Sequence, residues 1–480
     1  MTYESVIGLE VHVELATQTK IFCGCATQFG ADPNTQVCPI CAGLPGALPN
    51  LNQKALELGI RAGLATDCQI TPVTRFDRKH YFYPDLPKAY QISQLYAPLC
   101  IEGSVSIAVP GQEKKKIRIR EIHMEEDAGK LIHDPWTDAT WIDLNRCGVP
   151  LIEIVSQPDL SSAEEATAYL SDLALILQYA GVSDCKMEEG SMRADINLSV
   201  RPVGSTELGT RTEMKNMNSL KAIARAINSE AARQIELLES GKRVVQETRR
   251  WDDSKGKSLS MRSKEDAPDY QYFPDPDLPA VVIAIDEIER IRGQLPELPS
   301  ARLARYVHDL GLLPGDASLI VASARLSDWF EAAGRVCGNY QETANWILGD
   351  VFKWLHETSQ SADAITVPPD RFGRTVELVM KGVITRETAR RILPRILSGQ
   401  SGPDELVASE DLAVINDESS IEKAVQRVIA EQQKAVSEYI SGNDKVFSYL
   451  TGQVMRQLGG KAPAALVQRH LTAALQQLQD

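Results

Sequence analysis

Apolar and polar residues alternate near the start of the chain, as in a strand with two different faces. In residues 8–15 the apolar side chains occupy positions 9, 11, 13 and 15. A period of two therefore places Glu10, His12 and Glu14 together on the opposite face. The pattern predicts a β-strand that buries one face and presents two carboxylates and an imidazole on the other.

Four later strand-like segments also carry an acidic residue where the apolar pattern favours none. These acids are Glu125 in residues 122–127, Glu153 in 150–155, Asp195 in 193–200 and Glu213 in 210–215. Glu153 interrupts a run that otherwise reads as a fully buried strand, and a buried carboxylate needs a cation or hydrogen bonds. Together the five segments predict one polyanionic pocket. Several hard oxygen ligands with one imidazole suit Mg²⁺ bound to a nucleotide.

Each of these residues also has a simpler interpretation. An alternating strand with polar residues on one face is commonly half of an antiparallel sheet that faces water, which accounts for Glu10, Glu14 or Asp195 taken singly. Glu153 has no solvated face, so its alternatives are structural pairing with an arginine, or metal or catalytic use.

The helix signals divide the chain into regions. Residues 1–294 mix short strands and Pro- or Gly-containing turns with two clear helices, from Ser161 to Gly181 and from Ser219 to Gly241. Strands without a βαβ rhythm predict an α+β domain on a mostly antiparallel sheet. Residues 295–405 read as a helical middle domain and residues 406–480 as a small helical tail. Three domains suit a chain of 480 residues, which is too long for one core.

Composition narrows the class of protein. The longest apolar run, at residues 279–285, is too short to span a bilayer. Residues 1–5 lead into a strand without the basic and apolar stretches of a signal peptide, so we expect a cytoplasmic protein. A net charge of -14 argues against indiscriminate binding of nucleic acid.

One stretch departs from this acidic balance. Residues 370–396 contain more bases than acids, a pattern that fits either a local surface for structured RNA or an ordinary solvated helix face. The bases are Arg371, Arg374, Lys381, Arg386, Arg390, Arg391 and Arg395. Lys461 in the tail is a further candidate for RNA contact.

Four of the nine cysteines form two close pairs. Cys23 and Cys25 are followed, after a loop with Gly and Pro, by Cys38 and Cys41. Four thiolates so spaced predict a tetrahedral structural Zn²⁺ with no open position for chemistry; the alternative is reduced, buried thiols. The other five cysteines are isolated and read as small core residues.

Two aromatic segments echo each other, at residues 80–87 and 270–279, and their rings and proline-set turns suit stacking on a base. Lys79 precedes the first, and Arg262 and Lys264 precede the second, as candidate phosphate ligands. The sequence has no Walker A loop and no GxGxxG between a strand and a helix. Phosphates bound here would therefore be held by Mg²⁺ on carboxylates with Arg and Lys. No nucleophile with its base suggests amide hydrolysis by this chain.

Several long strings of the sequence resemble one known family. They are Ile7-Gly-Leu-Glu-Val-His-Val-Glu-Leu15, Asp77-Arg-Lys-His-Tyr-Phe-Tyr-Pro-Asp-Leu-Pro-Lys88, His123-Met-Glu-Glu-Asp-Ala-Gly-Lys130, Asn145-Arg-Cys-Gly-Val-Pro-Leu-Ile-Glu-Ile-Val155 and Met261-Arg-Ser-Lys-Glu265. Together with residues 346–350, 452–455 and 460–462, they look like the B subunit of the bacterial and organellar Asp/Glu-tRNA(Asn/Gln) amidotransferase.

This resemblance implies a specific activity and a set of partners. Members of this family bind a transfer RNA mischarged with Glu or Asp and use Mg-ATP to phosphorylate the side-chain carboxylate. Ammonia from the amidase, which is the A subunit of the complex, then displaces phosphate. A small C subunit clamps the other two together. The resemblance also implies a glutamine synthetase-like first domain and a helical tail that contacts RNA.

The resemblance further assigns roles to particular residues. It implies magnesium roles for Glu10, His12, Glu125 and Glu153, with Asp195 and Glu213 added to them, and catalytic use of His12, Glu125 and Glu153. Arg262, Lys264 and Lys79 are the phosphate candidates, whereas zinc is predicted from the cysteines of this sequence alone.

Two other functions remain to be compared with this one. A zinc-stabilised RNA-binding scaffold without catalysis gives little reason to desolvate Glu153. A free-standing ATP-dependent ligase for a small acid has no need of the long helical tail.

Overall fold

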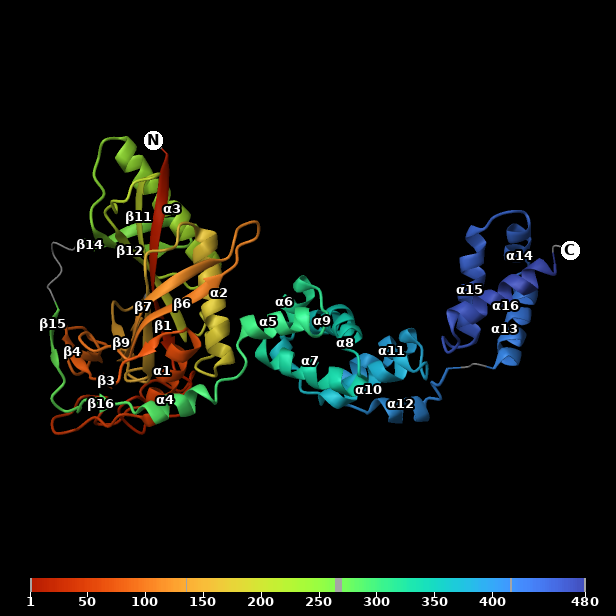
Figure 1. The fold of residues 1–480 in the computed structure, drawn as a ribbon, viewed down its shortest axis with the longest axis horizontal. Helices are drawn as coiled ribbons and strands as arrows, with labels where there is room; N and C mark the ends of the chain where they lie inside the picture. The colour runs from red at the N-terminus through yellow and green to blue at the C-terminus, as the bar shows by residue number, and fades with distance from the viewer. Residues whose placement is uncertain (1, 135, 264–269, 415–416, 479–480) are drawn as a thin grey trace. The chain divides into compact units, whose positions relative to one another are not determined.

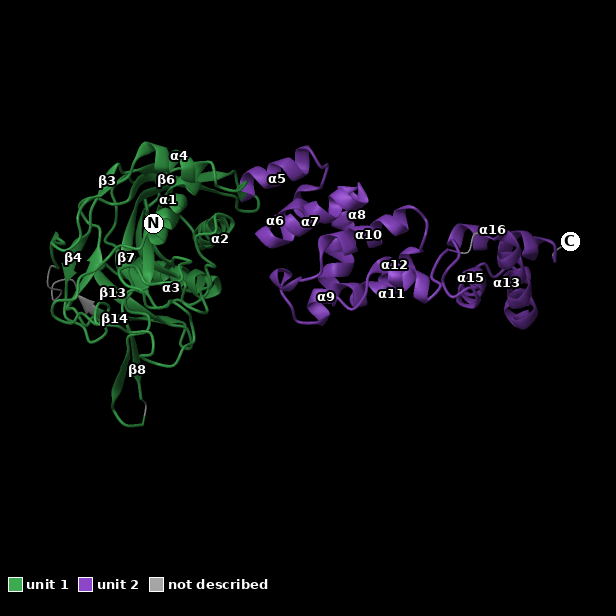
Figure 2. Ribbon diagram, turned by 90° about the horizontal axis from the view of Figure 1, so that it is seen from below, with its two compact units in different colours: residues 1–298 green, residues 299–480 purple. Residues whose placement is uncertain are grey.

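The computed structural model describes residues 2–134, 136–263, 270–414 and 417–478. It divides the chain into two compact units, residues 1–298 (unit 1) and 299–480 (unit 2), which are coloured separately in Figure 2. Unit 1 contains all the described strands, and after its last helix the described chain is helical. The fold is therefore of the mixed α+β kind that the sequence predicts.

Unit 1 is built on one large sheet and three small ones. The strands are β1 (Tyr3–Glu14), β2 (Gln69–Ile70), β3 (Val73–Thr74), β4 (Asp77–His80), β5 (Tyr90–Ser93), β6 (Cys100–Ile107), β7 (Lys115–Glu126), β8 (Lys130–His133), β9 (Thr140–Asp143), β10 (Pro150–Ser156), β11 (Met192–Pro202), β12 (Thr212–Lys215), β13 (Glu247–Asp252), β14 (Lys257–Ser263), β15 (Gln271–Pro274) and β16 (Val281–Val282). The nine-stranded sheet has the order β14-β13-β12-β11-β1-β10-β7-β6-β2. Only the β12–β13 pairing among its described strands is parallel.

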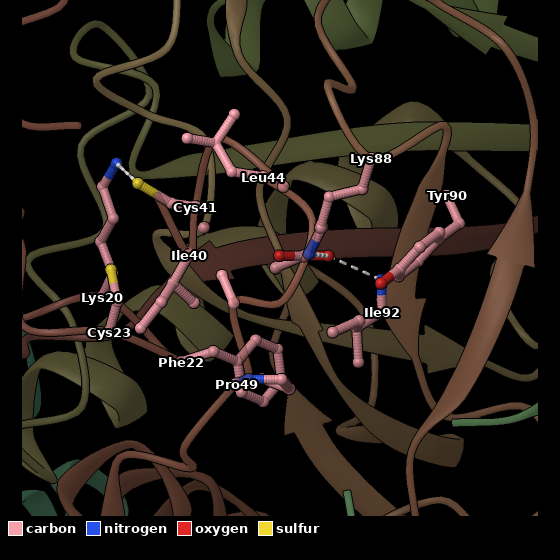
Figure 3. Close-up of a pocket in the computed structure, with 14 residues that line it drawn as sticks. Lys20, Phe22, Cys23, Ile40, Cys41, Leu44, Pro49, Lys88, Tyr90 and Ile92 are labelled. Atoms are coloured by element: carbon pink, nitrogen blue, oxygen red, sulfur yellow. Dashed lines mark hydrogen bonds and ion pairs between the residues drawn. The ribbon is translucent and has the colours of Figure 1, made fainter. Parts of the chain in front are cut away.

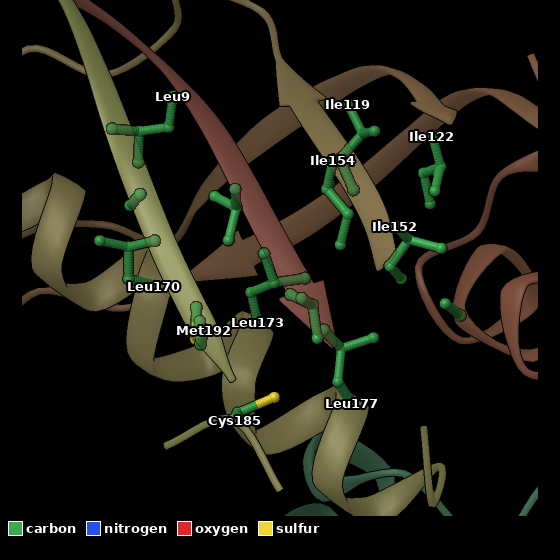
Figure 4. Close-up of a cluster of buried hydrophobic side chains, with 14 of the residues drawn as sticks. Leu9, Ile119, Ile122, Ile152, Ile154, Leu170, Leu173, Leu177, Cys185 and Met192 are labelled. Carbon is green, nitrogen blue, oxygen red and sulfur yellow. The ribbon is translucent and has the colours of Figure 1, made fainter. Parts of the chain in front are cut away.

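Three described helices of unit 1 pack on the apolar face of the large sheet, and a fourth packs against the first of them. The three are α1 (Gln53–Ala65), α2 (Ala163–Tyr179) and α3 (Leu220–Glu239), and the fourth is α4 (Ile285–Arg292). Leu170, Leu173 and Leu177 of α2 pack beneath Leu9 of β1 and Ile154 of β10, as Figure 4 shows. Burial of this face explains the alternation along β1, because its odd-numbered apolar residues enter the core.

Local signals set the helix boundaries close to their predicted positions. Ser219 caps α3 by accepting a hydrogen bond from the Ala222 amide, and Ser162, one residue after the predicted serine, caps α2 through the Glu165 amide. A serine oxygen satisfies an amide that has no partner inside the helix.

Unit 2 has only helices as its described regular secondary structure. It contains α5 (Pro299–His308), α6 (Pro314–Val321), α7 (Ala324–Cys337), α8 (Tyr340–Trp346), the π-helix η2 (Ile347–Val351), α9 (Phe352–Glu357), the 3₁₀ turn η3 (Ala362–Ala364), α10 (Pro369–Met380), α11 (Arg386–Leu397), α12 (Pro403–Ser409), α13 (Glu418–Glu431), α14 (Gln433–Ile440), α15 (Lys445–Gln457) and α16 (Ala464–Gln476). The helices from α13 to α16, at the blue end of Figure 1, share a hydrophobic cluster of their own, which includes Val425, Val454 and Leu471. The first two of these helices, α13 and α14, meet at Gln432.

The basic stretch of unit 2 is a solvated surface on which several bases have acidic neighbours. Arg390 donates to Asp350 at 2.9 Å, and Arg386 lies 3.0 Å from Glu342 and over the Trp346 ring. Arg395 pairs with Glu410. Such exposed pairs contribute little to stability, so these arginines can exchange partners at small cost.

Candidate functional site

The predicted magnesium residues all lie on the polar face of the large sheet. Glu10 and His12 are two residues apart on β1, which lies at the centre of the sheet. On one side His12 faces Glu153 of β10, and on the other Glu10 faces Asp195 of β11. Residues directly opposite each other on paired strands point to the same face, so the pairing brings these side chains together.

The structure divides the six predicted residues into two groups of three. Group 1 is His12, Glu125 and Glu153, on β1, β7 and β10, and group 2 is Glu10, Asp195 and Glu213, on β1, β11 and β12. Within each group, one ligand atom of each residue lies within 4.8 Å of the others. Because β1 supplies one member to each, the two groups are separated by roughly two residues of extended strand, or ~7 Å.

Burial and neighbouring acids make group 1 electrostatically strained. Burial, together with the nearby carboxylate of Glu125, raises the pKa of Glu153 to about 7 against the opposing effect of His12. His12 Nε2 lies 3.9 Å from Glu153 Oε1. The described chain places no arginine within ion-pair distance of Glu153, so the structural pairing that the sequence left open is absent there.

Hydrogen bonds from a neighbouring strand hold Glu125 in place. Its carboxylate is buried and accepts from Ser93 Oγ at 2.5 Å and from Gln91 Nε2 at 3.2 Å, both on β5. This strand belongs to the small sheet β15-β4-β5, which also carries Lys79. These donors fix one carboxylate of group 1 and were not identified from the sequence.

Each group has a lysine beside it. Burial lowers the pKa of Lys79, but the carboxylates of Glu125 and Glu153 together with nearby tyrosines outweigh that effect, and the net direction is upward. Lys79 also lies over the Tyr270 and Tyr81 rings, at 5.1 and 5.8 Å. These contacts join the two aromatic segments at group 1.

Lys215 lies beside group 2, as Lys79 lies beside group 1. Its Nζ lies 2.6 Å from Asp195 Oδ2 and 2.9 Å from Glu213 Oε1. These carboxylates raise the pKa of Lys215 despite the opposing effect of burial. The sequence analysis missed Lys215, although its position two residues after Glu213 on a strand places both on one face.

The other members of group 2 have polar neighbours on adjacent strands. Asn197 Nδ2 donates to Glu10 at 2.9 Å, and Thr248 Oγ1 donates to Glu213 at 2.8 Å. Glu10 and Asp195 are therefore half-buried and partnered, which differs from the simple water-facing sheet.

Of the two remaining phosphate candidates, the structure describes the strand position of Arg262 only. Arg262 lies on β14 opposite Thr248, which is opposite Glu213, so Arg262 shares a transverse row with group 2. Lys264 lies outside the described residues.

The four predicted zinc cysteines converge in the loop after β1. The Sγ atoms of Cys23, Cys25, Cys38 and Cys41 all lie within 4.8 Å of one another, and Cys38 Sγ is 3.9 Å from Cys41 Sγ. Tetrahedral zinc with Zn–S bonds of about 2.3 Å requires sulfur separations of ~3.8 Å. The hydrogen bond from Cys23 lowers the pKa of Cys41 to about 4. Cys41 is therefore the thiolate of this pair. The donor set and its spacing fit zinc.

A cavity lies between this cysteine cluster and the large sheet. Figure 3 shows Lys20 and Cys41 on one side of it and Lys88 and Tyr90 on another. Lys88 pairs with Glu126, the neighbour of Glu125 on β7. The cysteine loop therefore borders the strand end that supplies group 1.

No helix in the described part of the chain is long and apolar enough to cross a membrane.

Protein-family models match both units of the chain. Residues 5–289 match the model described as the GatB/GatE catalytic domain, and residues 328–475 match the GatB domain. The group 1 and group 2 residues all fall within the first match.

Curated relatives match along the whole chain. The aspartyl/glutamyl-tRNA(Asn/Gln) amidotransferase B subunit of Lachnoclostridium phytofermentans is 53% identical over 98% of this chain and 99% of its own length. The proteins of the same name from Caldicellulosiruptor saccharolyticus and Carboxydothermus hydrogenoformans are 50% and 48% identical, the first over the full length of both chains and the second over 99% of each. The resemblance noted in the sequence is confirmed: the chain belongs to the family of Asp/Glu-tRNA(Asn/Gln) amidotransferase B subunits.

Proposed function

We propose that this chain is the B subunit of a tRNA-dependent amidotransferase, a ligase that acts within a complex. It activates the side-chain carboxylate of Glu or Asp on mischarged tRNA(Gln) or tRNA(Asn) with ATP. It then forms the amide with ammonia from the amidase, its A subunit partner, in a complex with a small C subunit. The observation that carries this proposal is the pair of carboxylate-rich groups flanking β1 in the region that matches the catalytic domain.

Balanced chemistry requires two displacements. The substrate carboxylate oxygen attacks the γ-phosphorus of ATP and ADP leaves; ammonia then attacks the acyl carbon, phosphate leaves, and the nitrogen loses a proton. The nucleotide phosphates and the substrate carboxylate are both anionic, so a site rich in carboxylates needs cations before it can accept them.

Magnesium fits both groups, because each offers hard oxygen ligands and group 1 adds an imidazole. His12, Glu125 and Glu153 would hold one ion, and Glu10, Asp195 and Glu213 a second. When bound, the metal screens the phosphate charge and aligns the γ-phosphoryl group with the attacking oxygen.

The side chains around the groups position what enters. Ser93 and Gln91 keep the Glu125 carboxylate directed at group 1. We assign Lys79 to phosphate binding at group 1, with its ammonium held against two tyrosine rings. Arg262 is the corresponding candidate in the row of group 2, and Lys264 remains a prediction from sequence.

The rival function, a zinc-stabilised RNA-binding scaffold, does not account for group 1. Three close metal-ligating side chains, of which Glu153 is largely buried, destabilise the folded chain unless a cation is bound. A protein that only binds RNA has no use for a cluster that destabilises its fold.

The first prediction concerns catalysis. In the complex with its partner subunits, Glu125→Gln should lower ATP-dependent amidation of mischarged tRNA by more than ~100-fold, as loss of a preorganised electrostatic contact does. The assay supplies ATP, glutamine and each mischarged tRNA in turn, and identifies the esterified amino acid. Binding of the tRNA should stay unchanged.

Glu57→Gln, a surface change in α1 of the same unit, is the matched control and should retain activity. Undiminished phosphate transfer by the Glu125 variant would remove this residue from the site.

The second prediction concerns pH. The pKa of Glu153 rises from 4.5 to about 7 in the folded protein, so the folded state binds a proton that the unfolded state releases within this window. Metal-free protein should therefore lose stability as pH rises from about 4.5 to about 7. In thermal unfolding with EDTA, Glu153→Gln should flatten this loss.

Asp159→Asn serves as the control in the same unit. The hydrogen bond from Arg118 lowers the pKa of Asp159, so this residue stays ionised throughout the window, and its arginine partner does not titrate there. Its substitution should leave the pH slope as in the wild type. Equal slopes for all three proteins would contradict the environment assigned to Glu153.

The third prediction concerns zinc, which we propose as a structural ion at the four cysteines. Metal analysis of the purified chain should find about one zinc per chain, and Cys38→Ser should lose most of it. Cys337→Ser, a buried cysteine of unit 2, is the control. Full zinc retention in the Cys38 variant would refute the assignment.

The fourth prediction concerns the helical tail, for which the resemblance implies contact with RNA. Truncation after Gly402 should weaken tRNA affinity. Unit 1 should keep its fold, because its hydrophobic core contains no described residue beyond Leu298. Binding measurements with the intact complex and circular dichroism check the two parts. Equal tRNA affinity in the truncated and full chains would rule out the binding role.

A further inference from the structure

Lys20 is a fully buried lysine in the loop that follows β1. Its relative exposure is 0%. Burial of an ammonium group is costly unless an anion lies close to it. Such a residue therefore indicates negative charge in its surroundings.

The polar partners of Lys20 Nζ are few and come from two segments. The Nζ atom donates to Cys41 Sγ at 3.5 Å and to the carbonyl of Leu144 at 3.2 Å. Figure 3 draws the contact with Cys41. Of the described carboxylates, none forms an ion pair with Lys20. The cysteine cluster is thus the source of negative charge within hydrogen-bonding reach.

The backbone fixes Lys20 against this cluster. Its amide donates to the carbonyl of Cys25 at 2.9 Å. On the other side the lysine stem lies against Gly148, where an added Cβ would be 3.5 Å from Lys20 Cδ. The neighbouring Cys147 Sγ donates to the carbonyl of Cys41 at 3.4 Å. The ammonium is therefore held in a closed space beside one sulfur.

Charge balance connects these contacts with the metal. Four thiolates and one Zn²⁺ carry a formal net charge of about -2, because the metal offsets only half of the charge of its ligands. Four neutral thiols carry none and would leave Lys20 as a buried charge without an anion. A polar group that donates to a metal ligand orients it and raises affinity.

We propose that Lys20 is the buried counter-ion of a zinc tetrathiolate formed by Cys23, Cys25, Cys38 and Cys41, and that its ammonium holds Cys41 in ligating position. This inference rests on the zinc part of the proposed function. It makes Lys20 a positioning residue for the metal, and it couples the charge of the cluster to the wall of the cavity lined by Lys88 and Glu126.

The test compares the wild-type full-length chain with Lys20→Met, a neutral side chain of similar length. Zinc affinity is measured by competition with a chromophoric chelator. The variant should bind zinc ~10- to 100-fold more weakly, as expected when a partner of a metal ligand is removed.

Thermal unfolding provides a second readout that a packing role would not produce. Without zinc, Lys20→Met should unfold at a higher temperature than the wild type, because a buried charge without an anion has been removed. Zinc should then raise the unfolding temperature of the variant by less than that of the wild type. Equal destabilisation of the variant with and without zinc would show packing alone and overturn the proposal.

Lys88→Met is the matched control, because Lys88 lines the same cavity but pairs with Glu126, and among the described residues it donates no hydrogen bond to a sulfur. Its zinc affinity should equal that of the wild type. Equal zinc affinity of Lys20→Met and the wild type would also overturn the role of Lys20. A wild-type chain that binds no zinc would overturn the zinc site itself, an outcome that the competition assay separates from the others.

Discussion

Mutual repulsion among carboxylates on one sheet face is the constraint on which this structure depends. Group 1 and group 2 place five acids and a histidine around the centre of the large sheet. Like charges so close oppose folding, and they add to the larger effect of burial in raising the pKa of Glu153. Burial of the opposite, apolar face against α1, α2 and α3 supplies the compensating free energy. The apolar face thus stabilises the sheet, whereas the polar face needs bound cations to balance its carboxylates.

The same arrangement explains how the protein prepares for its substrates. β1 contributes Glu10 to one group and His12 to the other, so their separation is set by the rigid geometry of a strand. Lys79 and Lys215 supply part of the missing positive charge beside each group. Divalent metal with nucleotide phosphate would complete the balance and leave the sheet itself unmoved, as electrostatic preorganisation requires.

The cysteine loop is connected with the carboxylate groups through a shared cavity. It borders a cavity that Glu126 and Lys88 also line, and Glu126 ends β7 next to Glu125. Buried charges of both signs meet there, at Lys20 and at Lys88 with Glu126. Residues 23–40 of the loop include no fully buried side chain, so they contribute little to a hydrophobic core. Metal at the cysteines would fix this loop, and so fix the wall behind the candidate site.

Local features of this protein were readable from its sequence because they depend on neighbouring residues. Alternation over residues 8–15 placed Glu10 and His12 on one face, serines marked the starts of two helices, and paired cysteines indicated a metal. The division of six ligands into two groups came only from the strand order around β1, which hydrogen bonds between distant segments decide. For the same reason Lys20, Lys215 and the donors to Glu125 gained meaning only in the folded chain. The face of a strand on which a side chain lies follows from the local sequence. Its partner on the next strand depends on the strand register, which tertiary contacts set.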